Sequence, residues 1–189
     1  MYKYLTSILA VLLLALPVSS VRADEYDATI SIFKNAGASS GFFNNAYGYA
    51  VFPTIGKGGF WVGGAYGEGR VYQQGKYVGD TSVVQVTAGW QLGGQAYSQI
   101  IFFEDQRAFN EFTGGNFEFS AEANAIAITA GASASASTTG SSAGASGTNK
   151  NATTVGGYYK GMATFTVAKG GLMYAATLGG QKFSYTPHR

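Results

Sequence analysis

Apolar and polar side chains alternate along most of the chain from Tyr47 to Tyr185, and glycine, proline or asparagine residues separate the alternating segments. A period of two is the spacing of a β-strand, whose successive side chains point to opposite faces of a sheet. Strands are therefore predicted over residues 49–52, 60–72, 77–78, 82–92, 95–103, 117–128, 158–167, 172–178 and 182–185. The sequence Gln73-Gln74-Gly75-Lys76 is predicted to form the hairpin between the second and third strands.

The strand predicted over residues 82–92 has one apolar and one mostly polar face. The apolar face, predicted to be buried, carries Val84, Val86, Ala88, Trp90 and Leu92. The opposite face carries Gln85, Thr87, Gly89 and Gln91. This pattern is typical of a sheet with one side packed on a core.

Two short stretches have helical spacing instead. Ile30 and Phe33 predict a short amphipathic helix within the N-terminal segment 24–44, and Asp105 can cap a second helix whose apolar residues fall within 108–112. The first helix has two possible roles, because its apolar face could pack on the domain or enter a membrane interface.

Glycine is abundant in positions where it weakens a strand. The chain contains 28 Gly, and Gly63, Gly64, Gly67 and Gly69 fall within one strand pattern. Glycine there must serve geometry, because it lets a strand coil sharply or lets another backbone approach closely. We therefore predict a mainly β (α+β) fold, a compact, strongly curled antiparallel sheet or a closed barrel with one or two short helices.

Residues 1–23 are predicted to be a secretory signal peptide. Lys3 supplies a positive n-region, Leu5 to Leu16 an apolar core, and Val21-Arg22-Ala23 a small-residue cleavage site. The remaining chain is predicted to begin near Asp24 and to be exported to the periplasm or cell envelope, peripheral to the membrane. The 24–44 segment then precedes a β-rich domain over 45–189, which contains a flexible insert rich in Ala, Ser and Gly over 130–154.

Composition removes several classes of function. The chain has no Cys and one His, so neither a Cys-based metal site nor a cofactor is predicted. An enzyme is also disfavoured, because few residues of the types that carry catalysis are present. Beyond the leader, 10 basic residues balance 10 acidic ones, whereas nucleic-acid binding needs a basic surplus. Acid–base chemistry by Glu118 and Glu122 remains a rival hypothesis, although a solvated sheet face explains both carboxylates more simply.

Five segments in order resemble the SYLF domain family. They read GYAVFP at 48–53, GFWVGGAYGEG at 59–69, AGWQLGGQAYSQIIFF at 88–103, RAFNEF at 107–112 and KGGLMYAATLGGQKF at 169–183. The resemblance implies a non-enzymatic domain that binds phospholipid, in a family whose eukaryotic members also contact actin. Actin binding is not expected for an exported protein.

The residues themselves also suggest where lipid would bind, because an anionic headgroup region is recognised by cations beside apolar side chains. Lys57, Arg70 and Lys76 could converge on one edge of the glycine-rich strand and its hairpin, or they could be ordinary solvated turn cations. The candidate aromatic anchors are Phe42, Phe43, Phe60 and Trp61.

The sequence thus predicts an exported, non-enzymatic domain that associates peripherally with anionic phospholipid surfaces of the cell envelope. The alternative is a small outer-membrane β-barrel, which alternating strands, many aromatic residues and little charge would also fit.

Overall fold

A computed structural model of the chain describes residues 19–56, 64–86, 96–120, 123–128, 157–169 and 176–188. Its helices are α2 (Ser19–Asn35), α3 (Phe42–Asn45) and α4 (Gln106–Thr113). Its strands are β1 (Gly48–Gly56), β2 (Gly64–Gln73), β3 (Lys76–Val86), β4 (Tyr97–Phe103), β5 (Phe117–Glu118), β6 (Asn124–Ile128), β7 (Met162–Ala168), β8 (Ala176–Thr177) and β9 (Gln181–Pro187). The signal-peptide prediction up to residue 18 and the predicted insert at 130–154 lie outside the described residues.

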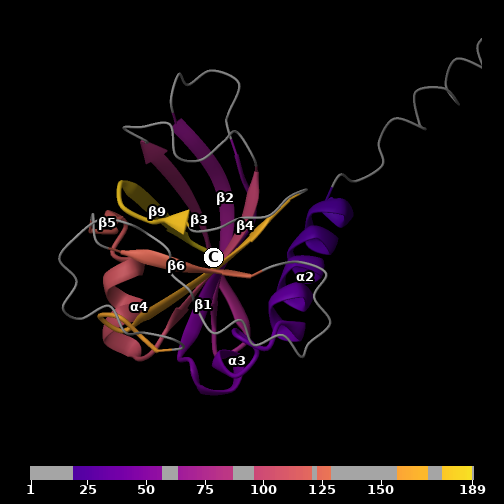
Figure 1. The fold of residues 1–189 in the computed structure, drawn as a ribbon, viewed down its shortest axis with the longest axis horizontal. Coiled ribbons are helices and arrows are strands. Elements are labelled where there is room, and N and C mark those ends of the chain that lie inside the picture. The colour runs from indigo at the N-terminus through magenta and orange to yellow at the C-terminus, as the bar shows by residue number, and fades with distance from the viewer. Residues whose placement is uncertain are drawn as a thin grey trace, which may run out of the picture.

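The described strands form one sheet in the order β5-β9-β3-β2-β1-β4-β7-β6-β8. Neighbours are antiparallel except β6 and β7, which are parallel. Figure 1 shows the strands fanned about a common centre, with α2 on one side and α4 on the other. The predicted mainly β, strongly curled sheet is confirmed.

The two ends of this strand order approach each other at the turn between β8 and β9. The Phe119 N–H donates to the Gln181 carbonyl at 3.1 Å, and the Leu178 N–H donates to the Ala123 carbonyl at 3.0 Å. The chain on either side of the turn is therefore bonded to the chain between β5 and β6. β5 and β8, the first and last strands of the order, therefore end close together.

The inner face of the sheet holds the larger core. Phe52, Phe103 and Phe183 are buried there, and α4 covers one end of this face with Ala108, Phe109 and Phe112. The Asp105 carboxylate accepts a hydrogen bond from the Ala108 N–H at 2.8 Å, so it caps α4 as its position in the sequence predicts.

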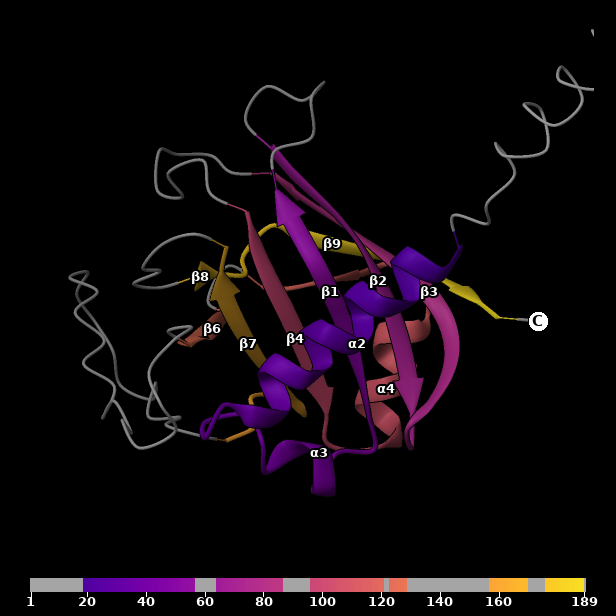
Figure 2. The same ribbon diagram turned by 90° about the vertical axis from the view of Figure 1, so that its right-hand side faces the viewer.

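The outer face of β1, β4 and β7 is covered by α2 (Figure 2). Tyr26, Ile30 and Phe33 of this helix are buried against a second apolar cluster. Its members on the sheet are Val51, Ile100, Phe102, Ala163, Phe165 and Val167. Two roles were possible for the N-terminal helix, packing on the domain or entering a membrane interface. In the structure it packs on the domain.

Gly67 and Gly69 explain why glycine occurs within β2. A Cβ atom at Gly69 would lie 2.6 Å from the Phe52 ring, and one at Gly67 would lie 2.7 Å from the Ile55 side chain. Both glycines therefore leave room for a large β1 side chain on the inner face of β2. At Gly67 the close approach of another backbone is also present, as predicted, because a Cβ there would lie 2.8 Å from the Thr54 carbonyl oxygen.

The hairpin predicted at Gln73-Gln74-Gly75-Lys76 is present. Gln74 and Gly75 have φ values of 49° and 79°, the positive values that a type I′ turn requires at both central residues. The first strand, however, does not end at Pro53 as predicted. β1 continues to Gly56, with a shift in register around Pro53, where the missing N–H is accommodated by the irregularity.

The two faces of β3 are opposite to those predicted. Val84 is 44% exposed, whereas Gln85 is 1% exposed and points into the inner core. The Gln85 side-chain oxygen accepts a hydrogen bond from the Tyr97 hydroxyl at 2.8 Å, which removes the cost of burying an unpartnered amide oxygen. The strand predicted over 117–128 is also divided, into β5 and β6.

Candidate lipid-binding surface

Arg70 lies on the outer face of β2, between two tyrosine rings. Its guanidinium carbon is 4.3 Å from the centre of the Tyr26 ring and 5.1 Å from that of Tyr77. Asp80 faces Arg70 across the β2–β3 pair. Arg70 therefore links α2 to β2 and β3 through cation–π contacts, in addition to any role toward a ligand.

Lys76 is exposed at the first position of β3, directly after the hairpin turn. Phe42 and Phe43 of α3 are half-buried. The Phe42 ring stacks on Phe102 at 5.4 Å, and the Phe43 ring meets the same phenylalanine edge-on at 4.8 Å. Both candidate anchors thus contribute part of their area to the second core.

An aromatic row extends from Phe43 across the hairpin end of the outer face. Its members are Phe43, Tyr49, Tyr72, Tyr77 and His188. Successive ring centres are separated by 5.3, 4.9, 6.0 and 4.6 Å. The row joins α3, β1, β2, β3 and the residue after β9, and it brings together parts of the chain that are far apart in the sequence.

The tyrosines of the aromatic row stay neutral at physiological pH. Burial, reinforced by the nearby Tyr72 and by the charge of Asp27, raises the pKa of Tyr49 to about 12. Burial and contact with Asp80 raise the pKa of Tyr77 to about 12. The row therefore adds no negative charge, and its flanking cations are Arg70 beside Tyr77 and Lys34, whose Nζ lies 5.5 Å from the Phe43 ring centre.

Lys57, Phe60 and Trp61 lie outside the described residues. The chain on either side of them is described, and Gly56 pairs with Tyr66 near the start of β2. Lys76 lies beyond the other end of the same strand, where it pairs with Gln73. Ten strand residues separate the two ends of β2 by roughly 30 Å. Lys57 lies outside the described residues, so its predicted convergence with Arg70 and Lys76 stays a prediction.

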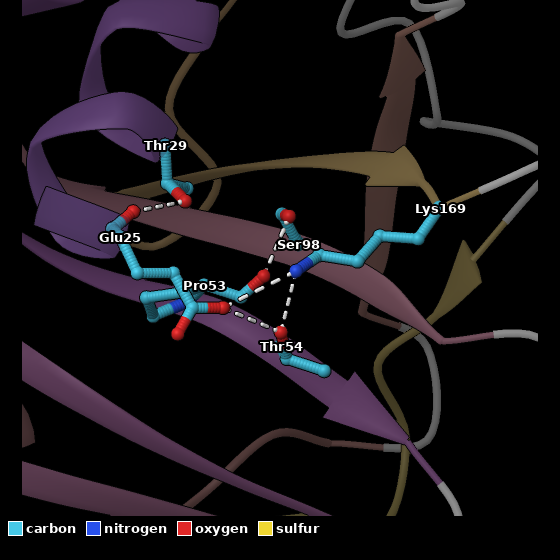
Figure 3. A network of polar contacts seen from close by, with 6 residues as sticks. All are labelled: Glu25, Thr29, Pro53, Thr54, Ser98 and Lys169. Carbon is cyan, nitrogen blue, oxygen red and sulfur yellow. Dashed lines mark hydrogen bonds and ion pairs between the residues drawn. The ribbon is translucent and has the colours of Figure 1, made fainter. Parts of the chain in front are cut away.

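Glu25, near the start of α2, is linked to the sheet by a polar triad that it forms with Thr54 and Lys169 (Figure 3). The Lys169 ammonium donates to the Thr54 hydroxyl at 2.6 Å and lies 3.3 Å from the Glu25 carboxylate. The Thr54 hydroxyl donates to the same carboxylate at 3.0 Å. These side chains are partly exposed, so the triad orients the helix while the buried rings supply most of its docking energy.

Glu118, one of the two carboxylates considered for acid–base chemistry, forms an ion pair with Lys182 at 3.5 Å on the solvent side of β5 and β9. Glu122 lies outside the described residues. Within the described ranges, no group of three or more His, Asp or Glu residues is placed to hold a metal ion. The helices in those ranges include none with the length and apolar character to cross a membrane.

Comparison with known proteins identifies the family. A sequence profile described as Ysc84, Las17-binding protein actin regulator, matches residues 84–186. The chain belongs to the Ysc84 family. The resemblance to the SYLF domain is thereby confirmed, and no curated protein matches the chain.

The Ysc84 match runs from the last residues of β3 through α4 to the next-to-last residue of β9, so it begins after most of the candidate surface. Phe42, Phe43, Arg70 and Lys76 all precede it. The predicted site residues therefore belong to the part of this chain that the family profile does not describe. Sequence reasoning missed Lys34 and the row tyrosines, although Tyr72 and Tyr77 on either side of the predicted hairpin could have indicated two of them.

Proposed function

We propose that this Ysc84-family protein is a non-enzymatic domain that associates reversibly with anionic phospholipid surfaces. The observation that carries the proposal is the aromatic row at the hairpin end, with cations beside it. Tyrosine is favoured at membrane interfaces because its ring is apolar and its hydroxyl is polar. A cation near an anionic surface contributes about 1 kcal/mol, so Lys34, Arg70 and Lys76 would give weak, salt-sensitive attachment.

Lys57, Phe60 and Trp61 form a second candidate contact in the proposal, because their segment joins the opposite end of β2. A membrane touching the hairpin end alone would leave them unused. The two contacts can be separated by variants, since Lys76 follows the hairpin turn and Lys57 follows β1 in the sequence. The proposal commits to the hairpin end as the main contact.

The test is co-sedimentation of the protein with vesicles of phosphatidylcholine alone or with one third phosphatidylglycerol, at low and high salt. Lys34→Ala and Lys76→Ala are each expected to weaken binding to the anionic vesicles by roughly fivefold, the equivalent of one cation. Lys182→Ala, on the solvent side of β9, is the matched control and should bind like the unaltered protein. Loss in Lys57→Ala alone would move the contact to the other end, and equal binding to both vesicle types would contradict the proposal.

Export is the second part of the proposal. Cleavage near Asp24 would remove the first turn of α2 and leave Glu25 of the polar triad close to the new N-terminus. N-terminal sequencing of the protein from a periplasmic extract is expected to begin near Asp24. An alkaline carbonate wash should release it from membranes, whereas retention in the pellet would favour an integral barrel.

The family description links relatives to Las17 binding and actin regulation. An exported protein does not meet actin, so this partner is not part of the proposal. Recovery of the protein from the cytosol with its N-terminus intact would overturn the export step and make actin co-sedimentation the next measurement.

A further inference from the structure

A hollow of about 360 Å³ lies on the outer face of β2, β3 and β9, beside the first described side chains of α2. Two rows of paired residues form its floor. Strand register places Glu68, Ser82 and Ser184 in one row and Arg70, Asp80 and Thr186 in the next. We name these six residues the polar grid.

Every side chain of the polar grid can form hydrogen bonds. It combines two carboxylates and one guanidinium with three hydroxyls, and the Ser82 and Ser184 hydroxyls are 2.7 Å apart. Strands are about 4.8 Å apart and alternate residues about 7 Å apart, so the grid measures roughly 10 by 7 Å. These are the dimensions of one sugar ring with its hydroxyl groups.

Exposed apolar side chains border the polar grid. Tyr66 and Val84 are paired across β2 and β3 in the next row, and they are 42% and 44% exposed. On the helix side the Tyr26 ring lines the same hollow. A polar floor beside exposed apolar surface matches a ligand that has hydroxyl groups along its edge and C–H bonds on its face.

We propose that the polar grid binds a neutral saccharide unit, which lays its apolar face on Tyr66 and directs its hydroxyls to the grid. A wholly apolar ligand would remove the charged groups of the floor from water without offering them hydrogen bonds, at a large cost. An anionic ligand is disfavoured, because two carboxylates face one guanidinium that Tyr26 and Tyr77 already flank. The grid is thus chemically distinct from the proposed phospholipid surface.

The test is an NMR titration of amide signals in the full chain with cellobiose, maltose and N,N′-diacetylchitobiose in turn. At least one disaccharide is expected to shift amides of β2, β3 and β9 with half-saturation in the millimolar range. Tyr66→Ala should weaken that binding by about fivefold or more, because it removes the stacking ring. Tyr66→Phe keeps the ring and should bind within about twofold of the unaltered protein.

Tyr159→Ala is the matched control, since Tyr159 is 44% exposed and precedes β7, away from the grid in the strand order. It should leave the titration unchanged. The proposal is wrong if none of the three sugars shifts these amides up to about 50 mM, or if inorganic phosphate shifts them and the sugars do not. Equal weakening in Tyr66→Ala and Tyr159→Ala would also overturn it.

Discussion

Gln99 of β4 and Gln181 of β9 face each other inside the curled sheet and exchange two hydrogen bonds, each 3.0 Å long. The Gln181 amide also donates to the Tyr97 hydroxyl at 3.0 Å, and this hydroxyl donates to Gln85 at 2.8 Å. All four side chains are at most 2% exposed. The network connects β4 through the interior to β3 and β9, neither of which is a neighbour of β4 in the sheet.

Gln181→Leu is expected to lower the free energy of unfolding by about 2–4 kcal/mol, because it leaves the Gln99 amide and the Tyr97 hydroxyl without this partner in a dry interior. Urea denaturation measures the loss. The double variant Gln99→Leu with Gln181→Leu should recover part of it, since both members of the pair are then apolar.

Lys182→Leu is the control for the glutamine pair. It alters the next residue of β9, whose side chain is exposed, and should change stability by no more than about 0.5 kcal/mol. Additive losses from Gln99→Leu and Gln181→Leu would contradict a direct pair, because residues that share hydrogen bonds are expected to be coupled.

Gly69→Ala is expected to destabilise the protein by about 1–3 kcal/mol, because its Cβ would overlap the Phe52 ring. The nearest ring carbons are 2.6 Å from the position of that atom, and Thr81 Cγ2 is 2.9 Å away. A thermal melt of the variant should show a lower midpoint than the unaltered protein.

Gly37→Ala provides the comparison for Gly69. A Cβ at Gly37 meets nothing within 4 Å, and the residue has no positive φ. The substitution should be neutral or stabilise by a few tenths of a kcal/mol, about the effect of a less flexible unfolded chain. A similar loss in both alanine variants would show that steric overlap with Phe52 is not the cause.

Much of the fold could be predicted from local sequence. Alternation located most strands, Gln74-Gly75 marked the hairpin, and Asp105 marked the start of α4, because each of these signals depends on neighbouring residues only. Which face of β3 is buried could not be predicted in this way. Burial of Gln85 depends on the Tyr97 hydroxyl, and the sequence does not say that these two residues meet.

The candidate site was predictable in its residue types and not in its geometry. Arg70, Lys76, Phe42 and Phe43 were identified as cations and rings, but their grouping required the strand order. Local patterns do not fix which ends of distant strands coincide, so they cannot show which of these side chains lie together.

Phe33→Ala is expected to lower the free energy of unfolding by about 3–5 kcal/mol, because this fully buried ring anchors α2 on the outer face of the sheet. Hydrogen exchange should show α2 losing protection before the strands do. Ile32→Ala, at a neighbouring position that is 45% exposed, should have little effect.

Lys169→Ala should lower the free energy of unfolding by at most about 1 kcal/mol, as expected for a partly exposed ion pair. A larger loss there than in Phe33→Ala would mean that the polar triad holds the helix.

Tyr97 is expected to make the protein sensitive to alkali. Burial raises the pKa of its hydroxyl from 10.0 to about 12 in the folded protein, although its bond from Gln181 acts in the opposite direction. The unfolded chain loses this proton at lower pH, so the stability contributed by the protonated hydroxyl is complete below pH 10 and declines between about pH 10 and 12. A shift of this size corresponds to roughly 2–3 kcal/mol. In Tyr97→Phe, stability at neutral pH should fall because Gln85 and Gln181 lose a partner. The decline of stability between about pH 10 and 12 should be smaller in the variant than in the unaltered protein. Urea unfolding at each pH measures both effects. An equally steep decline in the variant would assign the sensitivity to other tyrosines.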